Sequence, residues 1–345
     1  MPADDGAESR AGTTISVASA GSASSAGSPD RWKSSATSAG QRLDVYLAKV
    51  YKTSRNQAAG WIHAGLVAVG DKFAKPGLKL QGGEWISCEP LAPSQEGRVE
   101  PEPGSLVVLF EDQEIVVLDK PAALAVHPGA GRTSGTLANR LLAAYPEMAQ
   151  VGGPGRPGIV HRLDLGTSGV LVAARTRRAH QALAEAFAQR AVKKTYLAIV
   201  FGAPADAVGT MTAPIARNPQ RRKEMTVLLT GRPAETGYRV LATAANISFL
   251  ELTPVTGRTH QIRVHLKHIG HPIVGDPLYG EARWRDLEKV RRKPFEEFDR
   301  PALHAWRIEF RHPTTGRPCR FEAPIPDDIQ NLWRQATAQD LPLSG

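Results

Sequence analysis

An aspartate in a glycine-containing loop is the first candidate for chemistry in this sequence. Asp164 stands in "HRLDLGTSG", after His161 and Arg162 and just before an apolar run. A loop carried by a rigid sheet is a common place for catalytic residues, although an aspartate in a turn more often forms an Asx-turn or caps a helix. Further along, "TGRTHQIRVHLKHIG" predicts a helix with Arg263 on its polar side. Because a nearby guanidinium favours the ionised form of a carboxylate, we expect Arg263 to pair with Asp164.

The histidines near Arg263 invite comparison with zinc sites. They are His260, His265, His268 and His271. No two of them stand four residues apart, as two zinc ligands on one helix face would, and His265 would face away from His260 and His271. We therefore predict no metal site.

A glycine-rich stretch, "AVHPGAGRTSGTLANRLL", could cradle a phosphate through its backbone amides. It lacks the lysine of a G-K-[ST] motif, and the G-x-G-x-x-G form is absent. We interpret it as a loop leading into a helix that is capped near Thr136, so a nucleotide cofactor is not expected.

The apolar pattern predicts the elements that would position Asp164 and Arg263. "SLVVLFEDQEIVVLDKP" predicts two paired strands that end at Pro121, "GVLVAAR" a buried strand, "HQALAEAFAQR" a helix and "KKTYLAIV" another strand. These strands are joined largely by short turns rather than by regular helical crossovers. We therefore predict an α+β domain with a mostly antiparallel sheet and flanking helices, and not a doubly wound parallel sheet.

Length and composition restrict the class of protein. A chain of 345 residues suggests about two domains. No uninterrupted apolar run is long enough to span a bilayer, so no membrane partner is expected. The 43 basic residues exceed the 34 acidic ones, which gives a net charge of +9 and favours a polyanionic partner, nucleic acid above all. Two cysteines far apart in sequence exclude a disulfide framework and fit a reducing compartment.

Two breaks in composition divide the chain. Residues 1–40 contain 10 Ser, 9 Ala and 5 Gly, which predicts a disordered tail. Its acidic start without a continuous apolar core argues against a secretory signal, so a cytoplasmic location is expected. Residues 92–104 are rich in proline and charge, which predicts a linker. We therefore expect a small domain over 41–91, a main domain over 105–335 and a C-terminal tail over 336–345.

The small domain is predicted to hold two short helices and a hairpin. Ser54 and Gln57 have the spacing of a capping box, and a turn at Gly70 joins two short alternating runs. Its excess of basic residues fits either a solvated surface or contact with an RNA backbone. The segment from "RLDVYLAKVYKTSRNQAAGWIHAG" to "GGEWI" resembles an S4 domain, an RNA-binding module. That resemblance implies RNA contact by Arg42, Arg55 and Gln57.

The motifs of the main domain resemble those of the RluA family of pseudouridine synthases. They are "GIVHRLDLGTSGVLVAAR", "KKTYLAIVFG", "TGRTHQIRVHLKHIGHPIVGDPLYG" and "ALHAWRIEFRHPTTGRP". With the S4 segment, the match runs from about residue 41 to 329. "HPGAG" followed by "GTLANRLL" is most similar to the synthase D branch of the family, which is named for the large ribosomal subunit. The resemblance implies the same α+β fold and a substrate in large-subunit ribosomal RNA, with transfer RNA as a further candidate.

The resemblance also implies a reaction. In this family uracil is detached from C1′ at N1, turned and rejoined through C5, so no cofactor is required. Asp164 is the implied nucleophile, and attack on C1′ and proton abstraction from the sugar stay open as alternatives. Tyr196 would stack on the flipped uracil with Lys194 as its motif companion, and Arg263 would form a salt bridge with Asp164. By the same resemblance, Arg258 contacts phosphate.

A further arginine, two differences from the family pattern and two charged stretches bear on how the chain would contact RNA. Arg162 resembles the family's arginine that fills the space left by the extruded base. Many family members carry a basic residue and an aspartate where this chain has Leu165 and Gly166. The stretch 281–300 looks like a charged insertion, which we interpret as a solvated helical surface with RNA contact as the alternative. The basic loop 217–225 has the same two interpretations.

Two other functions compete with the synthase. One is a non-catalytic RNA-binding or ribosome-assembly protein, which would bind RNA without turnover. The other is a zinc-dependent or phosphate-cofactor hydrolase, suggested only by the histidines and the glycine-rich loop. Nothing in the sequence requires an oligomer, so we expect a monomer.

Overall fold

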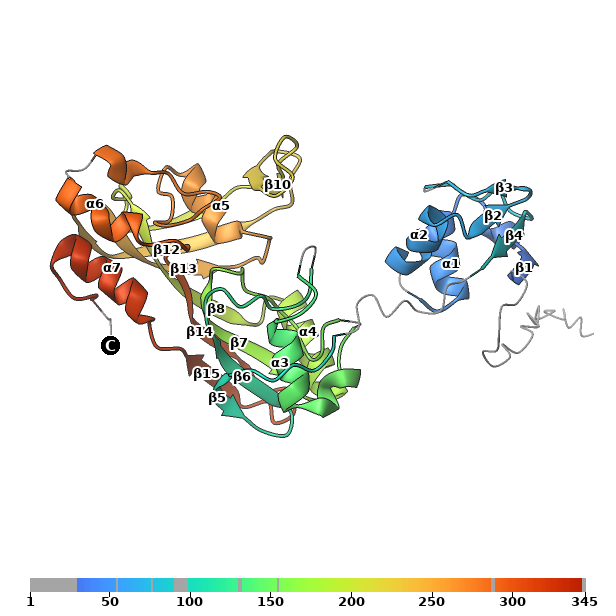
Figure 1. Cartoon of the computed structure of the whole chain (residues 1–345), viewed down its shortest axis with the longest axis horizontal. Coiled ribbons are helices and arrows are strands. Elements are labelled where there is room, and N and C mark those ends of the chain that lie inside the picture. The colour runs from blue at the N-terminus through green and yellow to red at the C-terminus, as the bar shows by residue number, and fades with distance from the viewer. Residues whose placement is uncertain are drawn as a thin grey trace, which may run out of the picture. The chain divides into compact units, whose positions relative to one another are not determined.

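The computed structural model describes residues 30–53, 55–75, 77–89, 99–129, 132–153, 155–286 and 289–342. The chain forms two compact units, one up to Glu96 and the other from Gly97 onward (Figure 1). Among the described residues, no helix has the length and apolar character needed to cross a membrane.

The first unit packs two helices against a small sheet. Its elements are β1 (Asp30–Lys33), η1 (Ala36–Ser38), α1 (Leu43–Val50), α2 (Arg55–His63), β2 (Val67–Val69), β3 (Lys72–Phe73) and β4 (Trp85–Cys88). The strands are antiparallel in the order β1-β4-β2-β3. Leu43 and Leu47 of α1 meet Trp61 and Ile62 of α2 in a buried core that includes Ile86 of β4. The two predicted helices and the hairpin are confirmed.

The tail predicted for residues 1–40 is too long at its C-terminal end. Strand β1 pairs with β4 over four residues, from Asp30 opposite Cys88 to Lys33 opposite Trp85. The first unit therefore includes residues 30–40. Residues 1–29 lie outside the described part of the chain, as does Ser54, the first residue of the predicted capping box.

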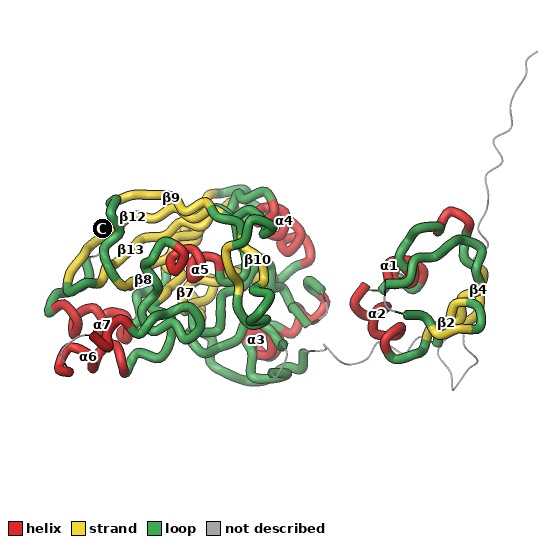
Figure 2. The backbone as a smooth tube through the Cα atoms, turned by 90° about the horizontal axis from the view of Figure 1, so that it is seen from above, coloured by secondary structure: helices red, strands yellow, loops and turns green. Residues whose placement is uncertain are grey.

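The second unit is built on one large sheet. Its strands are β5 (Val107–Glu111), β6 (Ile115–Lys120), β7 (Ser168–Ala174), β8 (Lys193–Phe201), β9 (Val208–Thr212), β12 (Glu235–Ala244), β13 (Ile247–Pro254), β14 (Leu303–Arg311) and β15 (Pro318–Glu322). The order is β5-β6-β7-β14-β8-β13-β12-β9, and β15 pairs with β14. Figure 2 labels β9, β12, β13, β8 and β7 of this sheet. Only β7 and β14 pair in parallel among the described strands. The predicted α+β class with a mostly antiparallel sheet is confirmed.

Helices and a separate hairpin surround this sheet. The helices are α3 (Leu137–Ala144), η2 (Pro146–Gln150), α4 (Arg177–Ala188), α5 (Gln261–His268), η3 (Arg283–Asp286), α6 (Lys289–Glu296) and α7 (Asp327–Thr337). Strands β10 (Ile215–Arg217) and β11 (Met225–Val227) form the hairpin. The cap predicted near Thr136 is confirmed, since Thr136 and Asn139 form a capping box at the start of α3.

Strand β7 is buried on both faces, which explains its continuous apolar sequence. Leu171 and Ala173 pack in the cluster that contains α3, whereas Val170 and Val172 pack in the cluster that contains α4. Successive side chains of a strand point to opposite faces, so α3 and α4 cover the two sides of β7. The loop that carries Asp164 therefore leads into the rigid centre of the sheet.

A glycine allows β7 and β14 to approach closely just after that loop. Gly169 has φ of +114°, and a Cβ there would lie 2.1 Å from the carbonyl oxygen of Ala305. No other residue type would fit this position without moving β14.

Three further predictions needed correction. Val99 is buried in the α3 cluster and Glu102 N–H donates to Asn139 O, so residues 99–104 of the predicted linker belong to the second unit; residues 92–98 lie outside the described part. The C-terminal tail predicted for residues 336–345 begins too early. Helix α7 continues to Thr337, and Leu341 packs on the core. Phe295 of the 281–300 stretch is buried, so that stretch is not merely a solvated surface.

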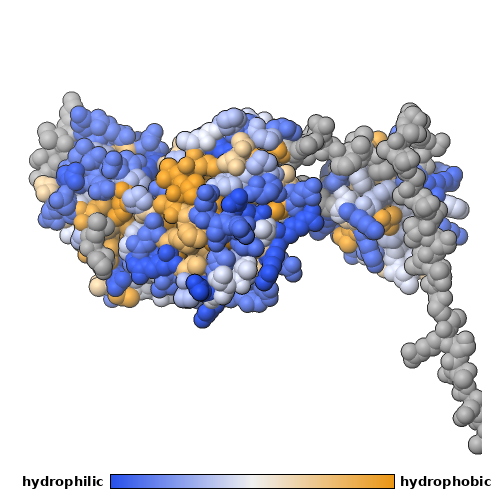
Figure 3. Space-filling model, turned by 90° about the horizontal axis from the view of Figure 1, so that it is seen from below, coloured by the Kyte–Doolittle hydropathy of each residue, from blue (hydrophilic) through white to orange (hydrophobic). Residues whose placement is uncertain are grey.

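The edge strand β5 exposes apolar side chains. Val107, Val108 and Phe110 are all exposed, and Phe110 also lies against Phe321 of β15. Seen from below, the second unit shows an apolar patch among hydrophilic residues, on the side where β5 lies in Figure 1 (Figure 3).

Candidate active site

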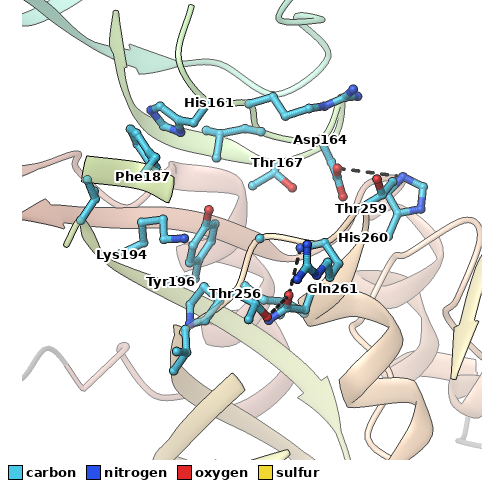
Figure 4. Close-up of a pocket in the computed structure, with 18 of the residues that line it drawn as sticks. His161, Asp164, Thr167, Phe187, Lys194, Tyr196, Thr256, Thr259, His260 and Gln261 are labelled. Carbon is cyan, nitrogen blue, oxygen red and sulfur yellow. Dashed lines mark hydrogen bonds and ion pairs between the residues drawn. The ribbon is translucent and has the colours of Figure 1, made fainter. Parts of the chain in front are cut away.

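A cavity in the second unit brings the two segments with predicted chemistry together. Its volume is about 470 Å³, within the range of roughly 300–1,000 Å³ common for small-ligand pockets. It is lined by residues 160–164, the end of α4, β8 and residues 254–263. Tyr196 and Lys194 reach into it from β8, Asp164 lies across from them, and Thr167 lies between (Figure 4).

The loop before β7 is fixed by a half-buried histidine, His161. The Val172 N–H donates to Nε2 of His161 at 3.0 Å, and the imidazole stacks on Phe187 with ring centroids 4.7 Å apart. Burial, with a smaller effect from the charge of Lys194, lowers the pKa of His161 to about 3. The ring is therefore neutral at physiological pH. Its role is to anchor the loop that presents Asp164.

Asp164 forms the predicted pair with Arg263. Nη1 of Arg263 donates to Oδ2 of Asp164 at 3.0 Å. The same guanidinium holds buried Asp276 through Nε at 2.6 Å and Nη2 at 2.7 Å. Burial alone would lower the pKa of Arg263, but its bonds and ion pairs with Asp276 and Asp164 raise it above the ordinary value. Arg263 therefore stays charged beside the carboxylate.

The turn before α5 is held by the side chain of Gln261. Its Oε1 accepts from Oγ1 of Thr256 and from the N–H of Arg258, and its Nε2 donates to Glu235 O and Thr236 Oγ1. Arg258 lines the cavity, and its Nε donates to Pro233 O. The predicted helix is confirmed, and Ile262 packs into the core while Arg263 faces Asp164. The polar side of this helix is not solvated throughout as an amphipathic pattern would suggest, because Arg263 and His265 are buried.

Tyr196 and Lys194 stand on β8 with altered ionisation. Burial, followed by the negative charge of Asp164, raises the pKa of Tyr196 above its ordinary value. The phenol is therefore neutral and able to donate a hydrogen bond. Burial also lowers the pKa of Lys194.

The sequence matches two family models in these regions. The family described as RNA pseudouridylate synthase matches residues 114–268, and the S4 domain matches residues 41–86. "Ribosomal large subunit pseudouridine synthase D" of Xanthomonas campestris pv. campestris is 44% identical over 299 residues, which are 86% of this chain and 89% of that protein. The chain belongs to the RNA pseudouridine synthase family. The protein of the same name from Escherichia coli O157:H7 is 41% identical over 298 residues, 85% of this chain and 90% of that protein.

Solved structures of pseudouridine synthases agree with this assignment. Human RNA Pseudouridylate Synthase Domain Containing 1 has a TM-score of 0.51 and 29% identity, covering 65% of this chain and 86% of its own. Human RNA Pseudouridylate Synthase Domain Containing 4 has a TM-score of 0.53 and 25% identity, covering 67% of this chain and 92% of its own. The predicted pseudouridine synthase with an S4 domain is confirmed, and the chain is an isomerase that acts on RNA.

In this pseudouridine synthase, the structure explains one of the two departures from the family pattern, the glycine at position 166. A Cβ at Gly166 would lie 2.7 Å from Cδ of Pro301, and Nη1 of Arg300 donates to Gly166 O at 3.3 Å. Arg300 also forms two hydrogen bonds with Asp328 of α7. Residues 300 and 301 thus occupy the space that a side chain at position 166 would need, whereas Leu165 is half exposed.

The histidines predicted not to bind metal have separate partners. His265 contacts Thr236 and Ala213 O, whereas His260 contacts Tyr279 and His271 contacts Phe201 O. No group of three or more metal-ligating side chains occurs within the described ranges.

The predicted RNA contacts of the S4 domain are tied to neighbouring side chains. Nε of Arg42 and Nε of Arg55 both donate to Asp44, at 3.0 and 2.8 Å. Arg42 holds the pKa of Asp44 well below its usual range, despite burial, with Arg55 assisting. Gln57 accepts from Oγ1 of Thr53. Both arginine side chains stay substantially exposed, as RNA contact would require.

Sequence reasoning overlooked several residues around Asp164. Buried Lys120 donates to the carbonyls of Pro121 and Leu124, and so fixes a turn whose Ala123 N–H donates to Leu165 O. Burial, opposed by the charge of Asp164, lowers the pKa of Lys120 to about 7. A lysine directly before a proline at the end of an apolar strand was the signal available for it.

Thr167 is another overlooked residue. It is buried and lines the cavity. Its Oγ1 has no hydrogen-bond partner among the described residues, which is unusual for a buried hydroxyl. The sequence could not indicate this, because serine and threonine in such a turn usually bond to nearby backbone.

Proposed function

We propose that this pseudouridine synthase modifies large-subunit ribosomal RNA, with Asp164, Tyr196 and Arg263 as its catalytic residues. The observation that carries the proposal is the setting of Asp164. Its carboxylate borders a cavity of about 470 Å³, and buried Arg263 holds one of its oxygens at 3.0 Å. The choice of RNA rests on relatives named for the large ribosomal subunit.

Asp164 would act on the ribose of a uridine extruded from its stack. Attack on C1′ and removal of the C2′ proton both require a carboxylate that is oriented toward the ribose, and Arg263 holds one of its oxygens at 3.0 Å. The N1–C1′ bond breaks, the uracil turns, and a C5–C1′ bond forms. C5 then loses its proton and N1 gains one, so the composition is unchanged and no redox partner takes part.

Tyr196 would hold the uracil during this rotation. A flat ring at the cavity wall can stack on a flipped base, and its neutral hydroxyl can donate to the base. Lys194, on the same strand, would contact the RNA from the neighbouring wall.

Arginines around the cavity would hold the RNA backbone. Arg162 is exposed at the cavity and would fill the space that the extruded base leaves. Arg258 would contact phosphate. In the S4 domain, RNA contact is proposed for Arg42, Arg55 and Gln57.

Action as a monomer is part of the proposal, because Asp164, Tyr196 and Arg263 already meet at one cavity within a single chain. Ribosomal RNA as the substrate supports a cytoplasmic location.

Pseudouridine mapping tests the proposal. Ribosomal and transfer RNA would be compared between cells with the gene, without it, and complemented by wild type, Asp164→Asn or Asp340→Asn. Asp340 is a matched control because it is an exposed aspartate paired with Arg334 at the surface. We expect sites in large-subunit RNA to be lost on deletion and restored by wild type and Asp340→Asn but not by Asp164→Asn. Loss confined to transfer RNA would refute the target, and restoration by Asp164→Asn would refute the role of the carboxylate.

A further inference from the structure

The residue before α5 has an unusual backbone conformation. His260 has φ of 55° and ψ of 22°, the left-handed region that residues other than glycine seldom adopt. Such conformations persist where the surroundings over-determine them, and they cluster at functional sites. The side chain of His260 makes no capping bond to the helix. Instead it lines the cavity, and a dashed line connects it to Asp164 in Figure 4.

The orientation of the imidazole is set by a tyrosine. The Met225 N–H of β11 donates to the hydroxyl of Tyr279 at 2.7 Å, and that hydroxyl lies 2.8 Å from Nδ1 of His260. The hydroxyl accepts from Met225, so its own hydrogen is available for Nδ1. Nδ1 then serves as the acceptor, and the proton of the neutral ring resides on Nε2.

The protonated nitrogen faces the oxygen of Asp164 that Arg263 leaves free. Nε2 of His260 lies 3.9 Å from Oδ1 of Asp164, whereas Arg263 holds Oδ2. A separation of 3.9 Å exceeds the length of a hydrogen bond. Catalytic hydrogen bonds, however, are often long without substrate and shorten in the complex. Burial lowers the pKa of His260, with the charge of Asp164 opposing it, so the ring is neutral.

We propose that His260, oriented by Tyr279, is a positioning residue that donates from Nε2 to Oδ1 of Asp164 when RNA is bound. This inference rests on the proposed role of Asp164. Arg263 and His260 then hold one carboxylate oxygen each, which fixes the rotation of the carboxylate toward the ribose. Met225 of the β10–β11 hairpin bonds to Tyr279, and Tyr279 bonds to His260. The position of this hairpin therefore sets the position of the imidazole.

Two substitutions at His260 separate donation to Asp164 from a role in which the residue merely supports the left-handed backbone conformation. The side-chain amide of glutamine can replace Nε2 as a donor, whereas the amide of asparagine lies closer to the position of Nδ1. Asparagine tolerates the left-handed backbone better than glutamine does. Positioning of Asp164 therefore predicts that His260→Gln is more active than His260→Asn, and a merely structural role predicts the reverse order.

Tyr279→Phe removes the hydroxyl and retains the ring that lies 4.9 Å from the guanidinium of Arg263. Tyr145→Phe is its matched control, because Tyr145 is a buried tyrosine bonded to Glu111 and lies outside the cavity lining. Turnover would be followed by tritium release from C5-labelled RNA, with RNA affinity and thermal unfolding measured on the same proteins.

We expect kcat to fall about 10- to 100-fold in His260→Asn, which loses one hydrogen bond to a charged group. A similar fall is expected in Tyr279→Phe, which removes the group that orients the imidazole for this bond. RNA affinity should be unchanged, Tyr145→Phe should behave as wild type, and His260→Gln should retain more activity than His260→Asn. Equal activity of the two His260 variants, or the reverse order, overturns the proposal. An inactive wild type would instead refute the proposed function.

Discussion

Arg263 is shared between the carboxylates of Asp164 and Asp276, which differ in burial. Its Nη1 holds Oδ2 of Asp164 at 3.0 Å, and its Nε and Nη2 hold Asp276 at 2.6 and 2.7 Å. Asp276 has no exposed side-chain surface, whereas that of Asp164 is 19% exposed. The inner carboxylate also accepts from the N–H groups of Leu278 and Tyr279. Asp276 therefore fixes the guanidinium that orients Asp164.

Replacing Asp276 by alanine should impair both stability and turnover. The substitution leaves buried Arg263 with Asp164 as its one remaining partner of the two, and the loss of a buried partner lowers the free energy of unfolding by up to about 3–5 kcal/mol. Urea denaturation of Asp276→Ala against Asp340→Ala, which removes an exposed carboxylate, measures that difference. Equal unfolding free energies of the two variants would show that Asp276 does not support Arg263.

The unpaired hydroxyl of Thr167 provides a second prediction. A buried hydroxyl at the cavity should find its partner in the bound nucleotide. We expect Thr167→Val to lower kcat/KM about tenfold, the value of one neutral hydrogen bond with its desolvation, and Thr167→Ser to restore it. The control is Ser168→Ala, because Ser168 is equally buried but already bonded to His304. If Thr167→Val matched wild type, the hydroxyl would have no substrate contact.

The sequence predicted the sheet and the main ion pair for physical reasons. A strand buried on both faces, such as β7, must be a continuous apolar run, and it is visible without any tertiary information. Arg263 could be paired with Asp164 because Asp164 stands in a loop just before that apolar strand and Arg263 stands on the polar side of a predicted helix. The strand β1 escaped prediction because "DRWK" does not alternate between apolar and polar residues, and it is ordered only by pairing with β4 more than 50 residues away.

The remaining contacts of the site depend on tertiary geometry. The left-handed backbone of His260 and its contact with Tyr279 follow from how α5 meets the segment after it. Position 166 could be recognised as a departure, but only the structure shows that Pro301 fills the space. The 281–300 stretch was expected to be solvated because it is charged, yet its aromatic residues Phe295 and Phe298 pack on the core.

Two histidines with lowered pKa values predict acid sensitivity. Burial lowers the pKa of His161 to about 3 and that of His304 to about 4, from an ordinary value near 6.5. Below pH 6.5 the unfolded chain binds protons that the folded chain does not, so stability falls as the pH falls toward these lowered values. Each histidine should account for about 2 kcal/mol of lost stability at pH 5. Urea unfolding at pH 7 and pH 5 should show a smaller difference in His304→Gln than in wild type, and an equal difference would contradict the assignment.

The exposed position after Asp164 allows a test of RNA contact. Leu165 is 50% exposed, so a lysine there is accommodated and adds a cation where many family members have one. We expect Leu165→Lys to bind RNA more tightly at low salt and to steepen the dependence of log Kd on log salt by about 0.7–0.9, the effect of one further phosphate contact. Leu165→Gln controls for the loss of the apolar side chain. An unchanged slope would place the RNA backbone away from this loop. Gly166→Asp, by contrast, should lower kcat, because its Cβ would clash with Cδ of Pro301 and so push the loop that carries Asp164 out of place.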